Sequence, residues 1–415
     1  MARKMKDSGI EWIGEVPEGW EVGQIGQLYS ERRTKVSDKD YPPLSVTMRG
    51  ILPQLSTAAK TDAHDDRKLV CKGDFAINSR SDRRGSCGIS EQDGSISLIN
   101  TVLQPRGEMN PGYYNWLFHT SMFADEFYKW GHGIVDDLWT TGWSDMKKIG
   151  VPVPSKCEQK QLAEHLNFEC SNIDTILSKT RSSIEEYKKL KQAVITQAVT
   201  KGVRGKREMK DSGVEWIGEI PVDWTIQRFA RVAEVKSNLV SPDNYLEYPQ
   251  ISPENIEKDS GKLLLPCKTV GEVGIISGNH LFYKGQILYS KIRPKLNKVC
   301  IAPFDGLCSA DMYPIETNND TRYIMYCILS NGFLQQVSMI TENRVKMPKI
   351  NQTELSKLLV AIPNFLAEQK EIADHLDAKC AEIDGLIAKK EQLVKELEGY
   401  KKSLIYEVVT GKREV

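Results

Sequence analysis

The sequence predicts an α+β protein in which two α/β domains, in a pseudo-two-fold arrangement, are separated by a long antiparallel two-helix coiled coil. Three observations predict this fold class. A segment near the N-terminus recurs in mid-chain, two long stretches carry apolar residues at heptad spacing, and the regions between them contain short strand-like runs. A chain of 415 residues is also too long for one ordinary domain.

The repeat defines the domain organisation. Residues 5–17 (MKDSGIEWIGEVP) and 209–221 (MKDSGVEWIGEIP) are identical at eleven of thirteen positions, and residues 154–202 parallel 363–411 at an offset of 210. The segments between these matches share little sequence, so a preserved frame carries two divergent inserts. The predicted boundaries are a first domain at 1–153, a spacer helix at 154–207, a second domain at 208–362 and a second spacer helix at 363–415.

Each half ends in a stretch that predicts a long helix. Steps of four and three residues from Leu162, and the same register from Ile372, keep mostly apolar residues in line for about five heptads. Ser155 with Glu158 fits a capping box, and Gly202 and Gly411 fit helix stops. The predicted helix-pairing residues are Leu166, Ile173, Tyr187, Leu190 and Val194 in the first helix, and Leu376, Ile383, Leu393, Leu397 and Leu404 in the second.

The charge of the two helical stretches indicates how they pair. Residues 151–207 carry 11 basic and 6 acidic side chains (net +5), whereas residues 359–415 carry 9 basic and 11 acidic side chains (net −2). Opposite charge favours pairing between the two helices over pairing of either with its own copy. An antiparallel pair follows, because the first helix carries the chain to the second insert and the second helix can return.

Both inserts are predicted to be mixed α/β domains. Residues 74–77, 96–99, 285–289 and 298–302 form short apolar runs bounded by turn-forming residues, as strands do. Helices are expected after Pro111-Gly112 and after Asn319-Asp320.

Composition and motifs exclude several classes of function. Lys and Arg (56) balance Asp and Glu (56), so any charged binding surface is local. Nine cysteines without a C-x-x-C pair, and no apolar run of about 18 residues, predict a cytoplasmic protein outside membranes. No phosphate-binding or nucleophile-elbow motif occurs, and His165 and Cys170 lie five residues apart, on different faces of a helix. We therefore predict no catalytic residue, no metal ligand and no cofactor in this chain.

Basic clusters provide the positive functional signal. One cluster follows the predicted strand 74–77 and the other follows 285–289, at equivalent places in two dissimilar inserts. Arg and Lys on such loops can contact guanine edges or phosphates, and neighbouring polar residues can add hydrogen bonds to bases. The predicted DNA-binding residues are Asn78, Ser79, Arg80, Arg83 and Arg84 in the first insert, and Lys291, Arg293, Lys295, Asn297 and Lys298 in the second.

The arrangement resembles the specificity subunit of a type I restriction-modification enzyme. The residues that carry the resemblance are the repeated Asp-Ser-Gly-x-Glu-Trp-Ile-Gly-Glu-x-Pro segments (7–17 and 211–221), the openings at 154–160 and 363–370, and the Val-Thr-[Lys]-Gly helix ends. The resemblance implies two target recognition domains, each reading half of a split DNA sequence, and paired helices that act as a ruler. It further implies docking to modification subunits, two of them expected, which hold S-adenosylmethionine, and to restriction subunits that translocate and cleave DNA.

Two alternatives remain at this stage. The chain could be a fused restriction or methylation enzyme with its own chemistry, although no cofactor loop is seen, or a coiled-coil scaffold with two ligand-binding heads and no DNA role.

Overall fold

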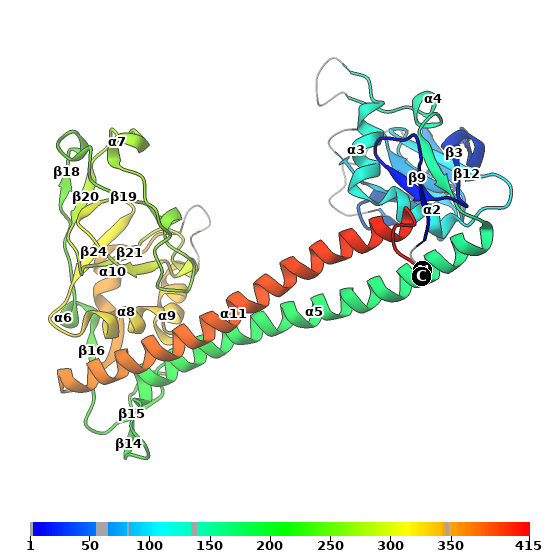
Figure 1. Cartoon of the computed structure of the whole chain (residues 1–415). Coiled ribbons are helices and arrows are strands. Elements are labelled where there is room, and N and C mark those ends of the chain that lie inside the picture. Colours follow the sequence, from blue (N-terminus) through cyan, green and yellow to red (C-terminus); the bar gives the residue numbers. More distant parts are fainter. Residues whose placement is uncertain (1–2, 55–64, 81–82, 134–138, 343, 345–347) are drawn as a thin grey trace. The chain divides into compact units, whose positions relative to one another are not determined.

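The computed structural model describes residues 3–54, 65–80, 83–133, 139–342, 344 and 348–415. The chain forms two compact units (Figure 1). Unit 1 comprises Met1–Thr180 and Gln392–Val415, and unit 2 comprises Arg181–Glu391. Each unit contains one mixed α/β head and a stretch of both long helices. Among the described residues, no helix is long and apolar enough to span a lipid bilayer.

The head of unit 1 is built on two antiparallel sheets and a hairpin. The larger sheet has the order β10 (Cys87–Ile89), β9 (Phe75–Asn78), β12 (Asn100–Pro105) and β4 (Tyr29–Glu31). The smaller has the order β11 (Gly94–Ile96), β8 (Arg67–Val70) and β5 (Lys35–Val36), and β6 (Leu44–Thr47) pairs with β7 (Gly50–Pro53). Helices α2 (Pro111–Phe118) and α3 (Ser121–Lys129) follow β12, and α2 begins at the predicted Pro111.

One predicted strand in this head lies earlier in the chain than expected. The run at 96–99 was expected to be a strand, but β11 ends at Ile96. The backbone N–H and the side-chain amide of Asn100 both donate to the Ser97 carbonyl oxygen, at 3.1 and 2.9 Å. The apolar residues after Ile96 therefore form the turn that leads into β12.

The head of unit 2 repeats the strand order of the larger sheet, but its other sheet has four strands and contains one parallel pair. Its larger sheet has the order β22 (Val299–Ile301), β21 (Ile287–Ser290), β24 (Met312–Glu316) and β17 (Glu234–Val235). Its other sheet has the order β19 (Gln250–Ile251), β23 (Gly306–Cys308), β20 (Asn279–Phe282) and β18 (Leu239–Val240). Helices α8 (Thr321–Leu329) and α9 (Asn331–Thr341) follow β24. The two dissimilar inserts thus share the order of the larger sheet and the two helices that follow it, in agreement with the predicted pair of α/β domains.

Pairs of short strands join the segments before and after each insert. In unit 1, β1 (Met5–Asp7) pairs with β2 (Glu15–Pro17), and β3 (Glu21–Gln24) pairs with β13 (Gly150–Val153). In unit 2 the equivalents are β14 (Met209–Asp211) with β15 (Glu219–Pro221), and β16 (Thr225–Arg228) with β25 (Leu359–Ile362). Pairing of β3 with β13, and of β16 with β25, brings the start and end of each insert together.

The remaining short elements are α1 (Ile25–Leu28), α4 (Trp143–Met146), α6 (Phe229–Val232), η3 (Pro242–Tyr245), η4 (Pro253–Asn255), α7 (Val270–Val273), η5 (Pro294–Leu296) and α10 (Gln352–Lys357).

The two long helices are α5 (Lys156–Lys201) and α11 (Leu366–Val409). The predicted capping box at the start of α5 is confirmed, because Glu158 N–H donates to Ser155 Oγ at 3.3 Å and Glu158 Oε2 accepts from Ser155 N–H at 3.3 Å. The predicted stops are confirmed too: Gly202 and Gly411 adopt φ of +75° and +71°, a conformation that glycine reaches without a Cβ clash.

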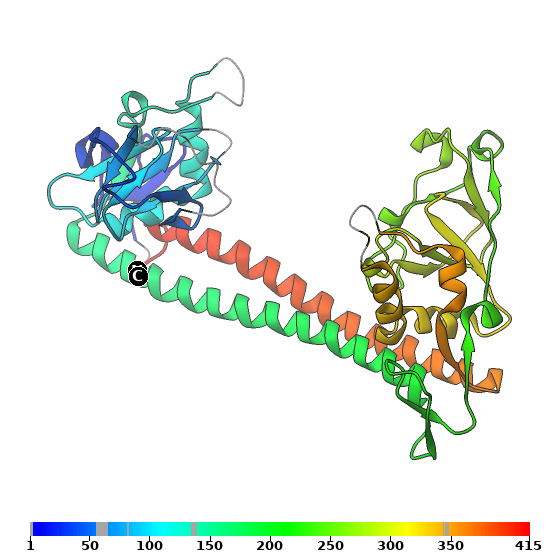
Figure 2. The same ribbon diagram turned by 180° about the vertical axis from the view of Figure 1, so that it is seen from behind.

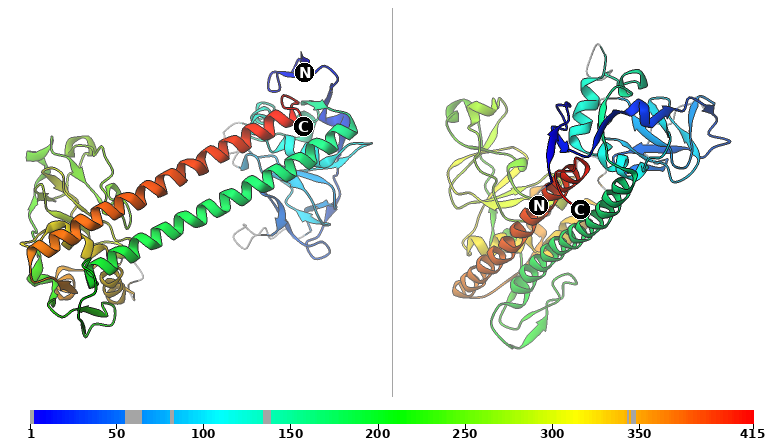
Figure 3. Two further views of the ribbon diagram at one scale, coloured as in Figure 1. Left: turned by 60° about the horizontal axis from the view of Figure 1, so that its bottom comes forward. Right: turned by 45° about the vertical axis from the view of Figure 1, so that its right-hand side comes forward.

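Within each unit the two helices lie side by side and antiparallel (Figures 2 and 3). In unit 2, Lys191 pairs with Asp384 at 2.9 Å and Arg204 pairs with Glu371 at 2.7 Å. Arg204 lies just after the end of α5, so the chain running forward from Lys191 to Arg204 meets α11 running backward from Asp384 to Glu371. In unit 1, Lys401 pairs with Asp174 at 2.6 Å.

The contact surface between the two helices differs from the predicted one at two of the ten predicted residues. Of the predicted residues, Leu166, Ile173, Leu376, Ile383 and Leu404 are buried, Tyr187, Val194 and Leu397 are half-buried, and Leu190 and Leu393 are exposed. The prediction was wrong for Leu190 (48% exposed) and Leu393 (41% exposed). On α5 the buried position is Lys191, one residue later, because its ammonium reaches Asp384 across the seam. A lysine whose charge is paired can bury its methylene stem, which a search for apolar residues overlooks.

The repeated Trp motif fastens the start of one helix to the end of the other. Trp20 Nε1 donates to Glu158 Oε1 in the first turn of α5 at 3.3 Å. Gly411, just after α11, lies so close to Trp20 that a Cβ added to this glycine would be 2.9 Å from the tryptophan ring. In unit 2, Trp224 Nε1 donates to Glu368 Oε1 at 3.2 Å. These contacts give a physical reason for the repeated sequence at both ends of the helix pair.

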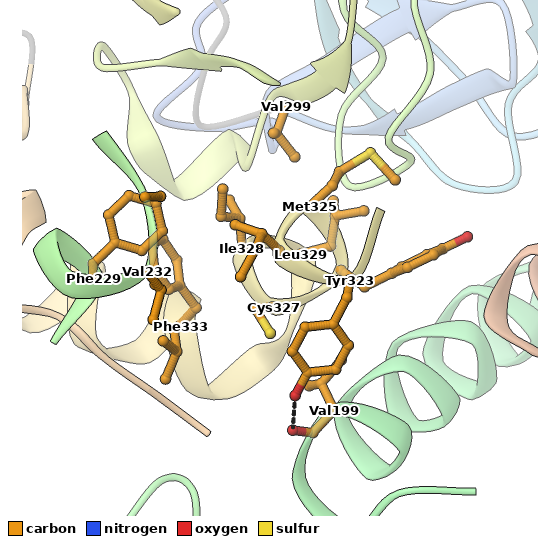
Figure 4. Packing of buried hydrophobic residues seen from close by; sticks show 14 of the residues in the cluster. Val199, Phe229, Val232, Val299, Tyr323, Met325, Cys327, Ile328, Leu329 and Phe333 are labelled. Atoms are coloured by element: carbon orange, nitrogen blue, oxygen red, sulfur yellow. Dashed lines mark hydrogen bonds between the residues drawn. The ribbon is translucent and has the colours of Figure 1, made fainter. Parts of the chain in front are cut away.

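A large apolar core joins the head of unit 2 to the helices (Figure 4). Phe229 and Phe333 pack edge to face with ring centroids 5.6 Å apart, and Tyr323 is fully buried. The Tyr323 hydroxyl donates to the carbonyl oxygen of Val199 on α5 at 3.3 Å. Head and helices of unit 2 therefore share one hydrophobic interior.

Candidate nucleic-acid interface

The two predicted basic clusters lie on equivalent hairpin loops. Residues 79–86 join β9 to β10, and residues 291–298 join β21 to β22. In both heads these strands are neighbours in the larger sheet. The prediction that the clusters occupy corresponding places in the two inserts is confirmed at the level of topology.

In the first loop, the arginines carry the exposed charge. Arg80, Arg83 and Arg84 are all exposed. Arg84 pairs with Asp125, and its guanidinium lies 4.8 Å from the ring centroid of Tyr128. This stacking restrains the planar cation, which is the form in which arginine binds phosphates and guanine edges.

The two polar residues predicted beside these arginines shape the loop. Asn78 is 8% exposed, and its Oδ1 accepts from the backbone N–H of Arg80 at 3.0 Å. Ser79 Oγ lies 2.9 Å from Thr101 Oγ1, a hydrogen bond between the residue that follows β9 and strand β12. Both side chains therefore form internal hydrogen bonds that set the direction in which the chain leaves β9.

In the second loop, the predicted residues fall into two groups. Arg293 and Lys295 are exposed, whereas Lys291 is half-buried with its ammonium 5.3 Å from the ring centroid of Tyr313. Lys298 Nζ donates to the Pro253 carbonyl oxygen at 2.7 Å and so anchors the loop. Exposed cations are the groups that can contact phosphate or base edges.

The backbone of the second loop is unusual. Arg293 has φ +45° and Asn297 has φ +42°, in the left-handed region that is uncommon for residues with a Cβ. Asn297 is 1% exposed, and its Nδ2 has no hydrogen-bond partner among the described residues. Such conformations cost on the order of 1 kcal/mol or more and cluster at functional sites.

The structure adds residues that sequence reasoning missed. At the start of β20, Asn279 Oδ1 and His280 Nδ1 are buried without a hydrogen-bond partner in the described part of the chain. In unit 1, Asn100 Oδ1 is likewise buried without a hydrogen-bond partner among the described residues, and Asn100 pairs with Asn78 between strands β12 and β9. Burial, together with the charge of Lys291, holds the pKa of His280 below its ordinary value, so the imidazole is neutral near pH 7. No sequence signal pointed to these residues, because only strand pairing brings them to the loops.

Strand order explains why these groups gather. His280 pairs with Cys308 across β20 and β23, and the backbone N–H of Lys291 donates to the carbonyl oxygen of Asp311, in the turn after β23. The start of β20 and the end of β21 therefore lie at the same edge of the head. This edge combines exposed cations with buried polar groups, a composition suited to an anionic, hydrogen-bonding ligand such as duplex DNA.

The described residues hold no group of three or more His, Cys, Asp or Glu side chains placed to bind a metal ion. Cys170 is buried in the helix pair, where burial raises the pKa of its thiol to about 11, while His165 is half-buried on another face of α5. A thiol with such a pKa is a poor nucleophile at neutral pH.

Comparison with known proteins finds similarity to type I specificity subunits. Residues 221–396 match the family model described as "Type I restriction modification DNA specificity domain". The chain is 37% identical over 255 residues to the EcoDI type I specificity subunit of Escherichia coli, an alignment that covers 58% of this chain and 57% of that subunit. It is 24% identical over 433 residues to the MjaVIII specificity subunit of Methanocaldococcus jannaschii, covering 96% of this chain and 93% of that subunit. The chain is therefore similar to type I specificity subunits, through the family model over residues 221–396 and through these two relatives.

Solved structures agree on the fold. A chain from a structure of a type I R-M system superposes with a TM-score of 0.71 over 95% of this chain and 98% of its own length, at 11% identity. The HsdS subunit from Thermoanaerobacter tengcongensis gives a TM-score of 0.53 over 96% of this chain and 98% of that subunit, at 14% identity. These structures confirm the predicted α+β fold with two heads. The family-model match and the EcoDI relative confirm the resemblance drawn from the repeated motifs. The matched segment 221–396 contains the loop at 291–298.

Proposed function

We propose that this chain is the DNA-recognition subunit of a type I restriction-modification system and reads an asymmetric, bipartite duplex target. The observation that carries this proposal is the placement of two different basic loops, 79–86 and 291–298, at the same position of two heads that share one fold. Two heads with the same fold but different loop sequences could each bind a half-site of a different base sequence. Arg80 and Arg293 are the exposed cations that we assign to base or phosphate contact in the two heads.

We further propose that the chain itself is non-catalytic. It would hold no cofactor, and S-adenosylmethionine would bind to partner modification subunits, two of which we expect, with restriction subunits joining through them. The similarity to type I specificity subunits favours this arrangement over the coiled-coil scaffold and the fused enzyme. The paired helices would then set the distance between half-sites, so that matched four-residue insertions in α5 and α11 change the accepted spacer and leave both half-site sequences intact.

The decisive experiment expresses the chain with its modification subunit and maps methylated adenines by methylation-sensitive long-read sequencing. We expect one bipartite motif with a fixed gap. Arg293→Ala should relax or weaken reading of one half only, by about 1 to 3 kcal/mol for a lost bidentate base contact, and Arg80→Ala should affect the other half. Lys298→Met, which removes the internal anchor on Pro253, serves as the control for loop disturbance. Methyl transfer by the purified chain alone, or loss of both half-sites in each arginine variant, would contradict the proposal.

A further inference from the structure

A second segment of the chain lies against the basic loop in each head. In the head of unit 1 it is residues 139–141, and in the head of unit 2 it is residues 348–350. Each segment comes after the second helix of its insert, α3 or α9. Neither belongs to the basic clusters that the sequence predicted, so its contacts with the loops come from the tertiary structure.

Backbone hydrogen bonds place the two segments equivalently. In unit 1, the N–H of Thr141 donates to the carbonyl oxygen of Ser79 at 3.0 Å. In unit 2, the N–H of Ile350 donates to the carbonyl oxygen of Lys291, also at 3.0 Å. Ser79 and Lys291 are the first residues of the loops at 79–86 and 291–298, which have equal length. Two heads with dissimilar sequences therefore keep the same backbone pairing at this edge.

The next pair of residues carries different side chains in the two heads. Arg80 forms an antiparallel bridge with Thr140 in unit 1, and Ile292 forms the corresponding bridge with Lys349 in unit 2. Each pair contains one exposed cation, Arg80 or Lys349, on opposite members of the pair. Side chains paired between antiparallel strands start about 4.5 to 5.5 Å apart. The two cations therefore occupy corresponding places in the two heads.

Surrounding contacts hold Lys349 in position. Its carbonyl oxygen accepts from the guanidinium of Arg344, which also donates to Glu354 Oε2 of α10 at 3.2 Å. The Lys349 ammonium lies 3.2 Å from Asp311 Oδ1, and the lysine side chain is still 50% exposed. Because an ammonium has more than one N–H donor, this ion pair restrains the side chain and leaves donors for a ligand.

The neighbouring carboxylate favours a base edge over a phosphate as the ligand of Lys349. Asp311 is 35% exposed beside the ammonium. A phosphate bound to the same ammonium would lie within several Å of this carboxylate, and the two anions would repel each other. A guanine edge presents neutral acceptors, O6 and N7, and meets no such repulsion.

We propose that Lys349 is a specificity-determining residue of the second head and that its ammonium contacts the major-groove edge of a guanine. It stands at the place that Arg80 occupies in the first head. Because the backbone pairing is shared while the side chains differ, the two heads can read different base pairs from the same position. This assignment rests on the proposed function, since it takes duplex DNA as the ligand.

The test uses the assembled complex of the full-length chain with its modification subunit, after its bipartite motif has been mapped. Fluorescence anisotropy measures binding to duplexes in which each base pair of the second half-site is exchanged in turn. In the wild type, exchange of the G·C pair that Lys349 contacts should weaken binding about 5- to 150-fold, the range of a good base contact. In Lys349→Thr the same exchange should change binding less than about twofold, with discrimination at every other pair and in the first half-site retained.

Three variants serve as controls. Lys349→Arg keeps a cation that also binds guanine, so discrimination at the same base pair should be retained. The double variant Asp311→Asn/Lys349→Thr also removes the carboxylate that Lys349→Thr leaves unpaired, and it should show the same loss of discrimination as Lys349→Thr. Lys284→Thr removes an exposed lysine from the turn between β20 and β21, at the opposite end of these strands, and should leave every binding ratio unchanged.

Two results would overturn the proposal. Equal weakening of Lys349→Thr on all duplexes, with a smaller dependence of binding on salt, would identify a phosphate contact. An unchanged pattern of discrimination in Lys349→Thr would show that the lysine contacts no base. If the wild-type complex yields no bipartite motif, the proposed function itself fails, whereas a mapped motif that Lys349→Thr reads normally refutes this inference alone.

Discussion

Replacing Asp384 by Asn tests the ionic contacts that join the helices of unit 2. Asp384 accepts from Lys191 at 2.9 Å through each of its oxygens, and Lys191 is 8% exposed. The variant leaves a buried ammonium without its counter-charge. The same substitution at the repeat-equivalent Asp174 is the matched control, since that carboxylate is 59% exposed.

The burial of each pair sets the expected size of the effect. Removing one partner of a fully buried ion pair costs about 3 to 5 kcal/mol. Asp384 is 21% exposed, and Asn keeps one acceptor, so we expect a loss of about 2 to 3 kcal/mol in the free energy of unfolding of unit 2. Asp174→Asn should cost less than about 1 kcal/mol, as exposed pairs do.

The assay combines calorimetry with hydrogen exchange. For a unit of about 200 residues, each 1 kcal/mol lowers Tm by roughly 2 to 4 °C, so Asp384→Asn should lower the transition of unit 2 by about 5 to 10 °C. Hydrogen exchange read by mass spectrometry assigns the loss to peptides of residues 181–391. In the double variant Lys191→Met/Asp384→Leu most of the loss should be recovered, because no uncompensated buried charge remains.

The same pair has a pH signature. Burial alone would raise the pKa of Asp384, but hydrogen bonds from Lys262 and Lys191 outweigh it and hold the pKa below its ordinary value. A carboxylate whose pKa is lowered by folding contributes stability above the pKa of the unfolded chain, about 4, and loses it as pH falls through the folded pKa. Acid should therefore destabilise unit 2 less steeply in Asp384→Asn than in wild type. Equal destabilisation by Asp174→Asn and Asp384→Asn, or an unchanged acid profile, would refute the reasoning.

Three further predictions follow from packing and exposure. Leu166→Ala should lower the free energy of unfolding of unit 1 by about 2 to 5 kcal/mol, because its side chain is fully buried, whereas Leu393→Ala, at 41% exposure, should cost less than about 0.5 kcal/mol in the same urea titration. Gly411→Ala should cost about 2 to 4 kcal/mol from strain and from a clash at its Cβ position, against about 1 kcal/mol for Gly9→Ala, which has a similar φ but open space; equal Tm shifts would contradict this. Arg293→Ala should lower the slope of log K against log salt by about 1 if the arginine neutralises a phosphate, measured by fluorescence anisotropy on the assembled complex.

Local sequence patterns predicted the helices well because helix signals are short-range. The capping box at Ser155, the left-handed stop at Gly202 and the start of α2 at Pro111 each depend on residues within one turn of the helix end. The residues at the contact between the two helices were harder to predict. Steps of four and three residues gave Leu166 and Ile173 correctly, but they chose Leu190 where the helix pair buries Lys191. Only the position of Asp384 on the opposite helix makes a buried lysine favourable.

Some residues of the candidate interface could be predicted from the sequence and others could not. The basic loops could be found from the sequence, because clusters of Arg and Lys after a short apolar run are visible without knowing the fold. The unpartnered atoms of Asn279, His280 and Asn100 could not, since β20 and β12 reach the loops only through strand pairing. Nor could sequence show that Asn78 and Lys298 are anchors within their heads.

Repeats, heptads and caps are encoded by neighbouring residues, so they were enough to identify a duplicated frame with two unlike α/β inserts and two long helices of opposite charge. Only the folded chain shows the strand order that the inserts share, which side of each helix is buried, and which charged residues are exposed. These features depend on contacts between residues far apart in the chain, where burial and charge pairing override the preference of any single side chain.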